Sequence, residues 1–396
     1  MFIRRRRAVW AAVVTSALVA HLGMDSALRA APRGPLPLRV TLVAAQQPGD
    51  PGLAEGAVRG LRAVRSTLGR RISVAYVFAP ADGVDPGAVE AVEPRLTATL
   101  EAAARSSDLV IASGDLLTGP AVGAASRHPA SRFVLMSSIY IAKPPSNLSE
   151  GWYRRDEEAF LAGAAAALAS RSHVIGFIGP VAYAAEQAAY RAGAHFVTPR
   201  VRVLADALAV TVTGTNRGAI PESWQSARDA GAFEQGTREP RAAEEVALAQ
   251  FDLGADVVYA AAGASNAGIY RAAVARDRWV ITRGAPGSER TLPQRWRDHT
   301  LVTITERPDA AVYQLVRQFV AAGRLPPHLT WGVAPFFAPR RPAGPVPPGI
   351  SSLDNASPVG FAVHRPAGLD TRRIASVLAG IVARIRTAGL AAGSSQ

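Results

Sequence analysis

The stretch YRRDEEAFLAGAAAALASRSHVIGFIGP, residues 153–180, decides the fold class of this chain. Its first half carries small and apolar residues at three- and four-residue spacing, which predicts one narrow helical face. The residues of this face are Phe160, Gly163, Ala164, Ala167 and Leu168. Asp156, Glu157 and Glu158 lie in the first turn, where acidic side chains favour the positive end of the helix dipole. The apolar run VIGFIG that follows is typical of a buried strand, so we expect a helix that lies close against a sheet and leads into that strand.

The same order of strand, loop and helix repeats along the rest of the chain. We expect strands at residues 38–45, 72–79, 107–114, 132–138, 203–214, 255–263, 278–284 and 299–305. We expect helices at residues 53–68, 85–105, 116–125, 186–196, 241–253, 266–276, 309–322 and 370–387. Strands that alternate with helices of this length indicate βαβ units and parallel sheets. The predicted fold class is therefore α/β.

Three stretches lack this periodicity. Residues 139–151 contain Pro144-Pro145 and are predicted to be a connector. Residues 216–240 are polar and are interpreted as a surface insertion, and residues 326–349 hold eight prolines and are interpreted as an extended loop. A length of 396 residues suits about two domains.

The net charge of +13 comes from arginine rather than from a basic patch. Lys143 is the sole lysine of the sequence, and the arginines are scattered among Asp and Glu. The only strongly basic run is Arg4–Arg7, and no basic motif interleaved with aromatic residues accompanies it. We therefore expect no nucleic-acid partner.

The N-terminus has the form of a secretion signal. Arg4–Arg7 provide the charged region, residues 8–22 the apolar core, and residues 27–31 a small-residue stretch suited to cleavage. We expect residues 1–30 to be a signal peptide, and the alternative is an uncleaved N-terminal anchor, which would be the protein's one contact with a membrane. Without cysteine the chain has no disulfide, no thiolate metal site and no lipid-bearing cysteine, so it is predicted to be periplasmic or extracellular and not a lipoprotein.

Catalytic and metal-binding motifs are missing from the sequence. None of the seven histidines is paired at metal-ligand spacing, and neither HExxH nor a glycine-rich phosphate loop is present. Residues 263–267, GASNA, resemble a nucleophile elbow around Ser265 but lack its final glycine. We expect no metal, no cofactor and no enzymatic activity, and a serine hydrolase that uses Ser265 remains as a lesser alternative.

Small polar residues recur where the predicted strands end. They include Gln46, Ser113, Ser137, residues 263–266 and Arg283. Each is an ordinary turn residue when taken alone. Parallel strands end at one edge of a sheet, however, and ligands of such sheets bind beyond that edge. The repetition therefore predicts that some of these residues line one binding site.

Three stretches resemble the basic membrane protein family of ABC-transporter solute receptors, which includes purine nucleoside receptors. Residues 153–180 are similar to the family's acidic-start helix and Gly-Phe-Ile/Val-Gly strand. Residues 190–194, YRAGA, are similar to its aromatic-x-Ala-Gly-Ala segment. Residues 253–258, LGADVV, with the loop 262–268, resemble its Gly-Ala-Asp-Val strand and the following loop.

The resemblance implies a type I periplasmic-binding-protein fold, with two Rossmann-like lobes joined by a hinge and a ligand closed between them. It implies a first lobe of residues 38–151 plus 303–324 and a second lobe of residues 152–301. Residues 350–396 then form a C-terminal strand and helix beyond the proline-rich loop 326–349.

The sequence departs from the family at the ligand positions. The first loop, Asp50-Pro-Gly-Leu53-Ala54, lacks the family's stacking ring, and Ser137 replaces an aspartate. Glu186 replaces a second aromatic residue, and Gly284 and Glu306 replace an aspartate and a lysine; only Gly263 agrees. Nucleoside specificity therefore does not carry over with the fold.

We predict an exported, monomeric, non-enzymatic substrate-binding protein of an ABC importer, which delivers a small polar or nucleoside-like ligand to a permease. The alternative is a membrane-anchored ligand sensor with the same fold. The predicted ligand-binding residues are Gln46, Asp50, Leu53, Ser113, Ser137, Gly263, Ser265, Asn266, Arg283 and Glu306.

Overall fold

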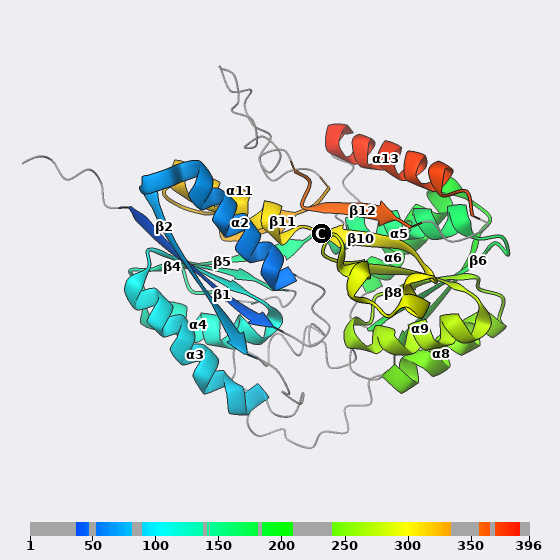
Figure 1. Cartoon of the computed structure of the whole chain (residues 1–396), viewed down its shortest axis with the longest axis horizontal. Helices are drawn as coiled ribbons and strands as arrows, with labels where there is room; N and C mark the ends of the chain where they lie inside the picture. The colour runs from blue at the N-terminus through cyan, green and yellow to red at the C-terminus, as the bar shows by residue number, and fades with distance from the viewer. Residues whose placement is uncertain are drawn as a thin grey trace, which may run out of the picture. The chain divides into compact units, whose positions relative to one another are not determined.

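The computed structural model describes residues 37–46, 53–80, 89–137, 141, 143–180, 184–208, 240–333, 356–364 and 369–388. Two six-stranded sheets and the helices that cover them make up this part of the chain (Figure 1). None of the helices within these ranges combines the length and the apolar character that crossing a bilayer requires. The predicted signal segment and the polar stretch 216–239 lie outside the described residues.

The first sheet has the strand order β11-β5-β4-β3-β1-β2, and each of its neighbouring pairs is parallel. Its strands are β1 (Leu38–Gln46), β2 (Ile72–Pro80), β3 (Leu109–Ser113), β4 (Arg132–Met136), β5 (Leu148–Tyr153) and β11 (His328–Trp331). The central strands are buried on both faces, as in sheets that helices cover from two sides. Along β1, for example, Val40 and Leu42 belong to one apolar cluster and Val43 and Ala45 to the other.

Two pairs of helices cover this sheet, and together they form the first lobe. Helices α2 (Leu53–Leu68) and α11 (Pro308–Ala322) pack on one face, and α3 (Val89–Ser106) and α4 (Thr118–Arg127) pack on the other (Figure 1). The side chain of Trp331 on β11 is completely buried in the first of these clusters.

The second sheet has the order β12-β10-β9-β8-β6-β7 and is parallel except for β12, which runs antiparallel to β10. Its strands are β6 (Val174–Pro180), β7 (Arg202–Leu208), β8 (Val257–Ala260), β9 (Trp279–Gly284), β10 (Thr300–Glu306) and β12 (Val359–Val363). The α/β class and the parallel sheets predicted from the sequence are confirmed, and the antiparallel edge strand is an addition to them.

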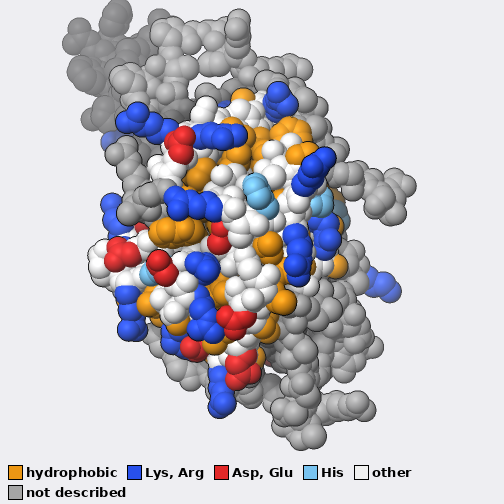
Figure 2. All heavy atoms as spheres, turned by 90° about the vertical axis from the view of Figure 1, so that its right-hand side faces the viewer, with side chains coloured by type: hydrophobic (Ala, Val, Ile, Leu, Met, Phe, Trp, Pro, Cys, Tyr) orange, Lys and Arg blue, Asp and Glu red, His pale blue; other side chains and the backbone are white. Residues whose placement is uncertain are grey.

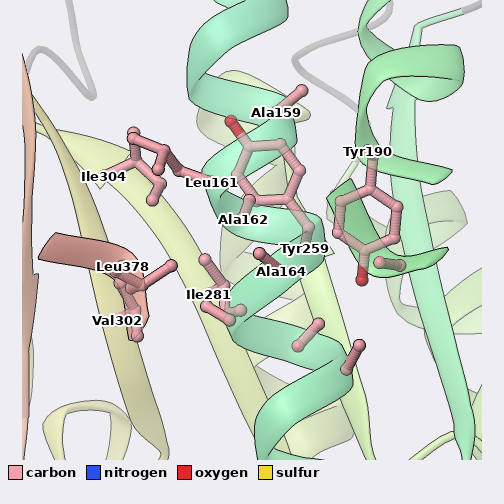
Figure 3. Close-up of a cluster of buried hydrophobic side chains, with 14 of the residues drawn as sticks. Ala159, Leu161, Ala162, Ala164, Tyr190, Tyr259, Ile281, Val302, Ile304 and Leu378 are labelled. Carbon is pink, nitrogen blue, oxygen red and sulfur yellow. The ribbon is translucent and has the colours of Figure 1, made fainter. Parts of the chain in front are cut away.

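Five helices cover the second sheet and complete the second lobe. Helices α5 (Arg155–Ala169), α6 (Ala184–Val197) and α13 (Thr371–Ala388) lie on one face, and α8 (Pro240–Asp252) and α9 (Asn266–Arg276) on the other (Figure 1). A single helical turn, α10 (Gln294–Arg297), leads into β10. Alanines of α5 fill the space between the sheet and α6, beside the stacked rings of Tyr190 and Tyr259 (Figure 3).

The glycines of α5 and α6 serve a contact between two helices. A Cβ atom on Gly163 would lie 1.9 Å from the carbonyl oxygen of Tyr190, and one on Gly193 would lie 2.0 Å from that of Phe160. Glycine at both positions therefore permits a backbone approach that no larger residue allows. We expected the small-residue face of α5 to lie against the sheet; its glycine lies instead against α6, and its alanines face the sheet side.

Three predicted boundaries differ from the structure. The predicted connector 139–151 contains the start of β5, and the predicted proline-rich loop 326–349 contains β11, which pairs with β5. Short strands between proline-bearing segments lack the alternation that reveals longer ones. The strand β10 lies wholly in the second sheet, so the predicted return to the first lobe at residue 303 occurs only after Glu306.

Two of the points where the chain crosses between the sheets are each held by a backbone hydrogen bond. Arg154, between β5 and α5, donates its backbone N–H to Trp331 O at 2.7 Å. Arg307, between β10 and α11, donates likewise to Pro358 O at 2.7 Å. Both arginines precede a helix and pair with the aspartate two residues later, at 2.6 Å for Asp156 and 2.8 Å for Asp309. The two crossings thus share one local design.

Candidate functional site

Predicted binding residues of the first lobe lie where its parallel strands end. Gln46 is the last residue of β1, Ser113 is the last of β3, and Ser137 follows β4 directly. Ser113 is the register partner of Met136 on β4, so Ser113 and Ser137 belong to the same edge of the sheet. Leu53 is half-buried at the start of α2, and Asp50 lies outside the described residues.

Neutral hydrogen-bonding groups dominate this edge. The hydroxyl of Ser137 donates to Asp115 Oδ1 at 2.7 Å and lies 3.0 Å from the hydroxyl of Thr118. Gly114, at a φ of 120°, lets the chain turn sharply here, and its N–H donates to Met136 O at 2.9 Å. This set of groups, Ser113, Asp115, Thr118 and Ser137, is called the serine edge below.

At the end of β8 the polar side chains mostly hold the turn. Asn266 accepts a hydrogen bond from the N–H of Ala262 at 2.9 Å and donates one to Ala260 O at 3.1 Å. Ser265 is completely buried, whereas Gly263 is exposed at a φ of 53°. A buried hydroxyl does not favour the hydrolase alternative, because a nucleophile must reach its substrate.

A buried ionic cluster occupies the corresponding edge of the second sheet. Arg283, near the end of β9, donates from Nη1 to Glu158 Oε2 at 3.5 Å. The same guanidinium lies 3.6 Å from Glu186 Oε2 and 3.7 Å from Glu306 Oε1. Arg155 lies 3.9 Å from the other oxygen of Glu186. These five residues are called the Arg283 cluster.

Two predicted residues, Arg283 and Glu306, thus lie together, and three others join them. Glu158 and Arg155 come from the first turn of α5, and Glu186 comes from the first turn of α6. Both helices begin at the edge where the parallel strands end, because β6 runs between them from the opposite edge. The sequence contained one sign of this cluster, since Glu186 stands where the resembled family has an aromatic ligand residue.

The acidic triplet of α5 has three separate roles. Asp156 pairs with Arg154, and Glu157 accepts a hydrogen bond from the N–H of Val333 at 2.7 Å. Glu158 belongs to the Arg283 cluster. We expected these three residues to serve only the helix dipole; Asp156 also pairs with a residue close in sequence, and Glu157 and Glu158 also make tertiary contacts.

Burial dominates the electrostatics of the cluster. Desolvation, together with the neighbouring Glu306 carboxylate, raises the pKa of Glu158 to about 8 against the opposing effect of Arg283. Burial likewise raises the pKa of Glu186, again opposed by Arg283. Burial by itself lowers the pKa of the Arg283 guanidinium, but Tyr259 and the three glutamates outweigh it and hold that pKa well above its usual value. Arg283 therefore stays charged, whereas burial favours the protonated forms of Glu158 and Glu186.

The described residues hold no group of three or more histidine, cysteine, aspartate or glutamate side chains arranged to bind a metal ion. The prediction that the protein needs no metal or cofactor stays a prediction.

Comparison with known proteins confirms the family resemblance over part of the chain. The family model described as Bmp, ABC transporter substrate-binding protein PnrA-like, matches residues 41–210. This range takes in most of the first sheet together with α5, β6, α6 and β7. The resemblance to the basic membrane protein family is thereby confirmed, with residues 41–210 as the matching part.

Curated relatives agree with the family model. Basic membrane protein D of Borreliella burgdorferi is 24% identical over 226 residues, which cover 56% of this chain and 57% of the relative. The ABC transporter nucleoside-binding protein BmpA of Lactococcus lactis is 28% identical over 184 residues, which cover 44% of each chain. The chain thus spans about half the length of the curated relatives it matches.

Solved structures show the same fold. An ABC transporter solute-binding protein from Conexibacter woesei has a TM-score of 0.57 at 16% identity, over 90% of this chain and 98% of that one. A solute-binding protein from Aeropyrum pernix has a TM-score of 0.52 at 16% identity, over 89% and 88%. A transcriptional activator of the comK gene from Bacillus halodurans has a TM-score of 0.56 at 13% identity, over 89% and 98%. The predicted type I periplasmic-binding-protein fold is confirmed.

Proposed function

We propose that the protein is the exported solute-binding component of an ABC importer, which closes two lobes around a small polar or nucleoside-like ligand. The observation that carries the proposal is the match of residues 41–210 to a family of ABC transporter substrate-binding proteins. The placement of polar side chains at the strand ends of both sheets supports it, because ligands of such sheets bind beyond those ends. The protein then acts outside the cytoplasm, without catalysis, and passes its ligand to a permease.

The crossings between the two sheets support a hinge. The segments at Arg154 and Arg307 are short, and each is held by a backbone hydrogen bond and an arginine–aspartate pair. Rotations about a few such residues can bring two lobes together. A ligand that contacts both lobes then favours the closed state by its extra affinity for that state.

The nucleoside-like part of the proposal rests on the relatives. One curated relative bears the name of a nucleoside-binding protein. At several predicted binding positions, such as Ser137 and Glu306, this chain differs from the family it resembles. Its ligand can therefore differ from an unmodified nucleoside. A library that runs from nucleosides to sugars covers this range.

The test is a thermal-melting screen of the purified protein against that library. A ligand present at 100 times its dissociation constant adds about 2.7 kcal/mol to the free energy of unfolding, which is a measurable rise in melting temperature. We expect at least one compound to raise the melting temperature in a saturable manner. A well-folded protein whose melting temperature no compound changes would contradict the proposal.

A further inference from the structure

Ion pairs of the Arg283 cluster are loose compared with those on the surface of the same protein. The guanidinium of Arg283 lies 3.5–3.7 Å from its three carboxylates. The more exposed pair between Arg271 and Glu244 is 2.7 Å long, in the range of a good charge-assisted hydrogen bond. A buried cluster that had closed on itself would show short distances. The guanidinium of Arg283 is instead shared among three carboxylates and holds none of them at a short distance.

Three carboxylate oxygens of the cluster lack a hydrogen bond, although Glu186 Oε2 and Glu306 Oε1 lie within ion-pair distance of Arg283. Glu158 Oε1, Glu186 Oε2 and Glu306 Oε1 are buried, and none of them has a hydrogen-bond partner among the described residues. Unsatisfied buried carboxylate oxygens are costly, and each calls for an explanation. Three in one place indicate that a donor-rich group belongs there.

A separate observation comes from β8. The hydroxyl of Tyr259 is also completely buried and also lacks a hydrogen-bond partner within the described part of the chain. Figure 3 shows Tyr259 on the side of the sheet that α5 covers, and its hydroxyl interacts electrostatically with Arg283, Glu186 and Glu158. Its electrostatic partners are members of the cluster, Arg283 foremost among them. A fourth acceptor therefore faces the same place from a different element.

The charge balance favours a cation. Among the described residues the cluster contains three glutamates and two arginines, so full ionisation leaves 2 − 3 = −1. A bound anion would add to this excess of negative charge, whereas a bound cation would cancel it. An ammonium or guanidinium group suits these oxygens, because its several N–H donors can bond more than one acceptor at a time.

The cluster reaches the protein surface on one side. The side chain of Arg283 is 14% exposed, and those of Glu186 and Glu306 are 7% and 5% exposed, with Glu158 completely buried behind them. All of them lie at the edge where the parallel strands end, beyond which ligands of such sheets bind. A ligand group can therefore approach from this edge.

We propose that the Arg283 cluster is the subsite for a protonated amine or guanidinium group of the transported solute, with Glu158, Glu186, Glu306 and the Tyr259 hydroxyl as its acceptors. This inference rests on the proposed function and narrows its ligand class to cationic solutes. The raised pKa of Glu158 agrees with it, because a bound proton replaces the missing cation while the site is empty.

A series of probes on one scaffold tests the charge preference. Adenosine is neutral, 5′-amino-5′-deoxyadenosine carries a protonated amine, and adenosine 5′-monophosphate is an anion; agmatine and spermidine test cations without a nucleoside. We expect a cationic probe to bind at least tenfold more tightly than its neutral counterpart in isothermal titration calorimetry at pH 7, which is about 1.4 kcal/mol.

Variants locate the binding to the cluster. Glu306→Gln removes one negative charge from the cluster, and we expect it to weaken the binding of the cationic probe at least fivefold. The matched control is Glu245→Gln, which removes an exposed carboxylate that pairs with Arg241 on the surface of α8. We expect the control variant to bind as the parent does. Equal affinity of the parent and the Glu306→Gln variant would overturn the assignment.

Proton release gives a readout in the unmodified protein. A cation that binds beside Glu158 lowers that group's pKa, so binding at pH 7 should release close to one proton, and the release should fall at pH 9, where Glu158 is already ionised. Titrations in buffers of different ionisation enthalpy measure this number. Tight binding of a neutral or anionic probe, with no preference for the cation, would overturn the inference and leave the proposed function standing. If no compound of the library bound to the protein, that result would contradict the proposed function itself.

Discussion

The two sheet edges of this protein have the same topology and opposite chemistry. In each sheet the parallel strands end at one edge, and polar side chains follow them there. The serine edge of the first lobe is built from hydroxyls and one aspartate, with a hydrogen bond of 2.7 Å at its centre. The Arg283 cluster of the second lobe is built from buried charges whose distances are 3.5 Å or more.

The difference shows that topology decides where a site lies and side chains decide what it can bind. The βαβ arrangement brings strand ends together in both lobes whatever residues occupy them. The neutral edge is held by short hydrogen bonds, whereas the ionic edge keeps buried oxygens without a hydrogen bond and a glutamate whose pKa is raised to about 8. On the face seen in Figure 2 the basic side chains are interspersed with acidic ones, so the exposed charge there is mixed.

The largest loss of stability is expected from a substitution in the Arg283 cluster. Arg283→Met leaves three buried glutamates without their shared cation, and the loss of one partner from a buried ion pair costs about 3–5 kcal/mol. Chemical denaturation should show a larger loss at pH 8 than at pH 5, because the glutamates can take up protons at the lower pH. The control is Arg271→Met, which removes a shorter but more exposed pair and should cost at most about 1 kcal/mol. A similar cost for the two variants would mean that Arg283 is not the central charge of its edge.

A second prediction concerns pH. The pKa of Glu158 is about 8 in the folded protein and lies near 4.5 in the unfolded chain, so the folded state holds the extra proton between these values. The contribution of this group is therefore fully present below pH 4.5 and is lost as the pH rises toward 8. Glu158→Gln, which imitates the protonated form, should flatten the fall of the free energy of unfolding between pH 5 and pH 8. An unchanged slope in the variant would show that Glu158 does not hold the proton.

The smallest effect is expected at the serine edge. Ser137→Ala removes a hydroxyl that donates to Asp115, and one neutral donor is worth about 0.5–1.5 kcal/mol of stability. The serine hydroxyl does not titrate in this range, so the loss should be the same at pH 5 and pH 8. Ser126→Ala is the control, because that exposed hydroxyl bonds only the carbonyl of its own helix at Val122. If the stability lost in Ser137→Ala depended strongly on pH, the two edges would not differ in the way proposed.

Much of the fold was predictable from local patterns. The helix of residues 155–169 and the strand of residues 174–180 follow from periodicity and from the flanking glycine and proline. The strands β5 and β11 escaped prediction because each is short and lies next to prolines. Their pairing joins segments more than 170 residues apart, and no local pattern records such a contact.

The candidate site was predictable only in part. Arg283 and Glu306 were identified because they stand where strands end, and the family comparison pointed to the position of Glu186. Glu158 was interpreted as a helix-terminal acid, since its sequence neighbours, Asp156 and Glu157, gave a sufficient local explanation. Asn266 was expected in the site on the same basis as Arg283, and its side chain bonds the backbone of its own turn.

By itself, the sequence of residues 153–180 determined that a close-packing helix precedes a buried strand, because side-chain period and residue size act locally. The tertiary structure alone decided that Gly163 meets α6 and that Glu158 meets Arg283. Those contacts depend on how helices and strands distant in sequence pack together, and burial then changes the charge chemistry of the groups enclosed. The helix and the strand of this stretch thus follow from local periodicity, whereas the ionic character of the edge that holds the Arg283 cluster arises from tertiary packing.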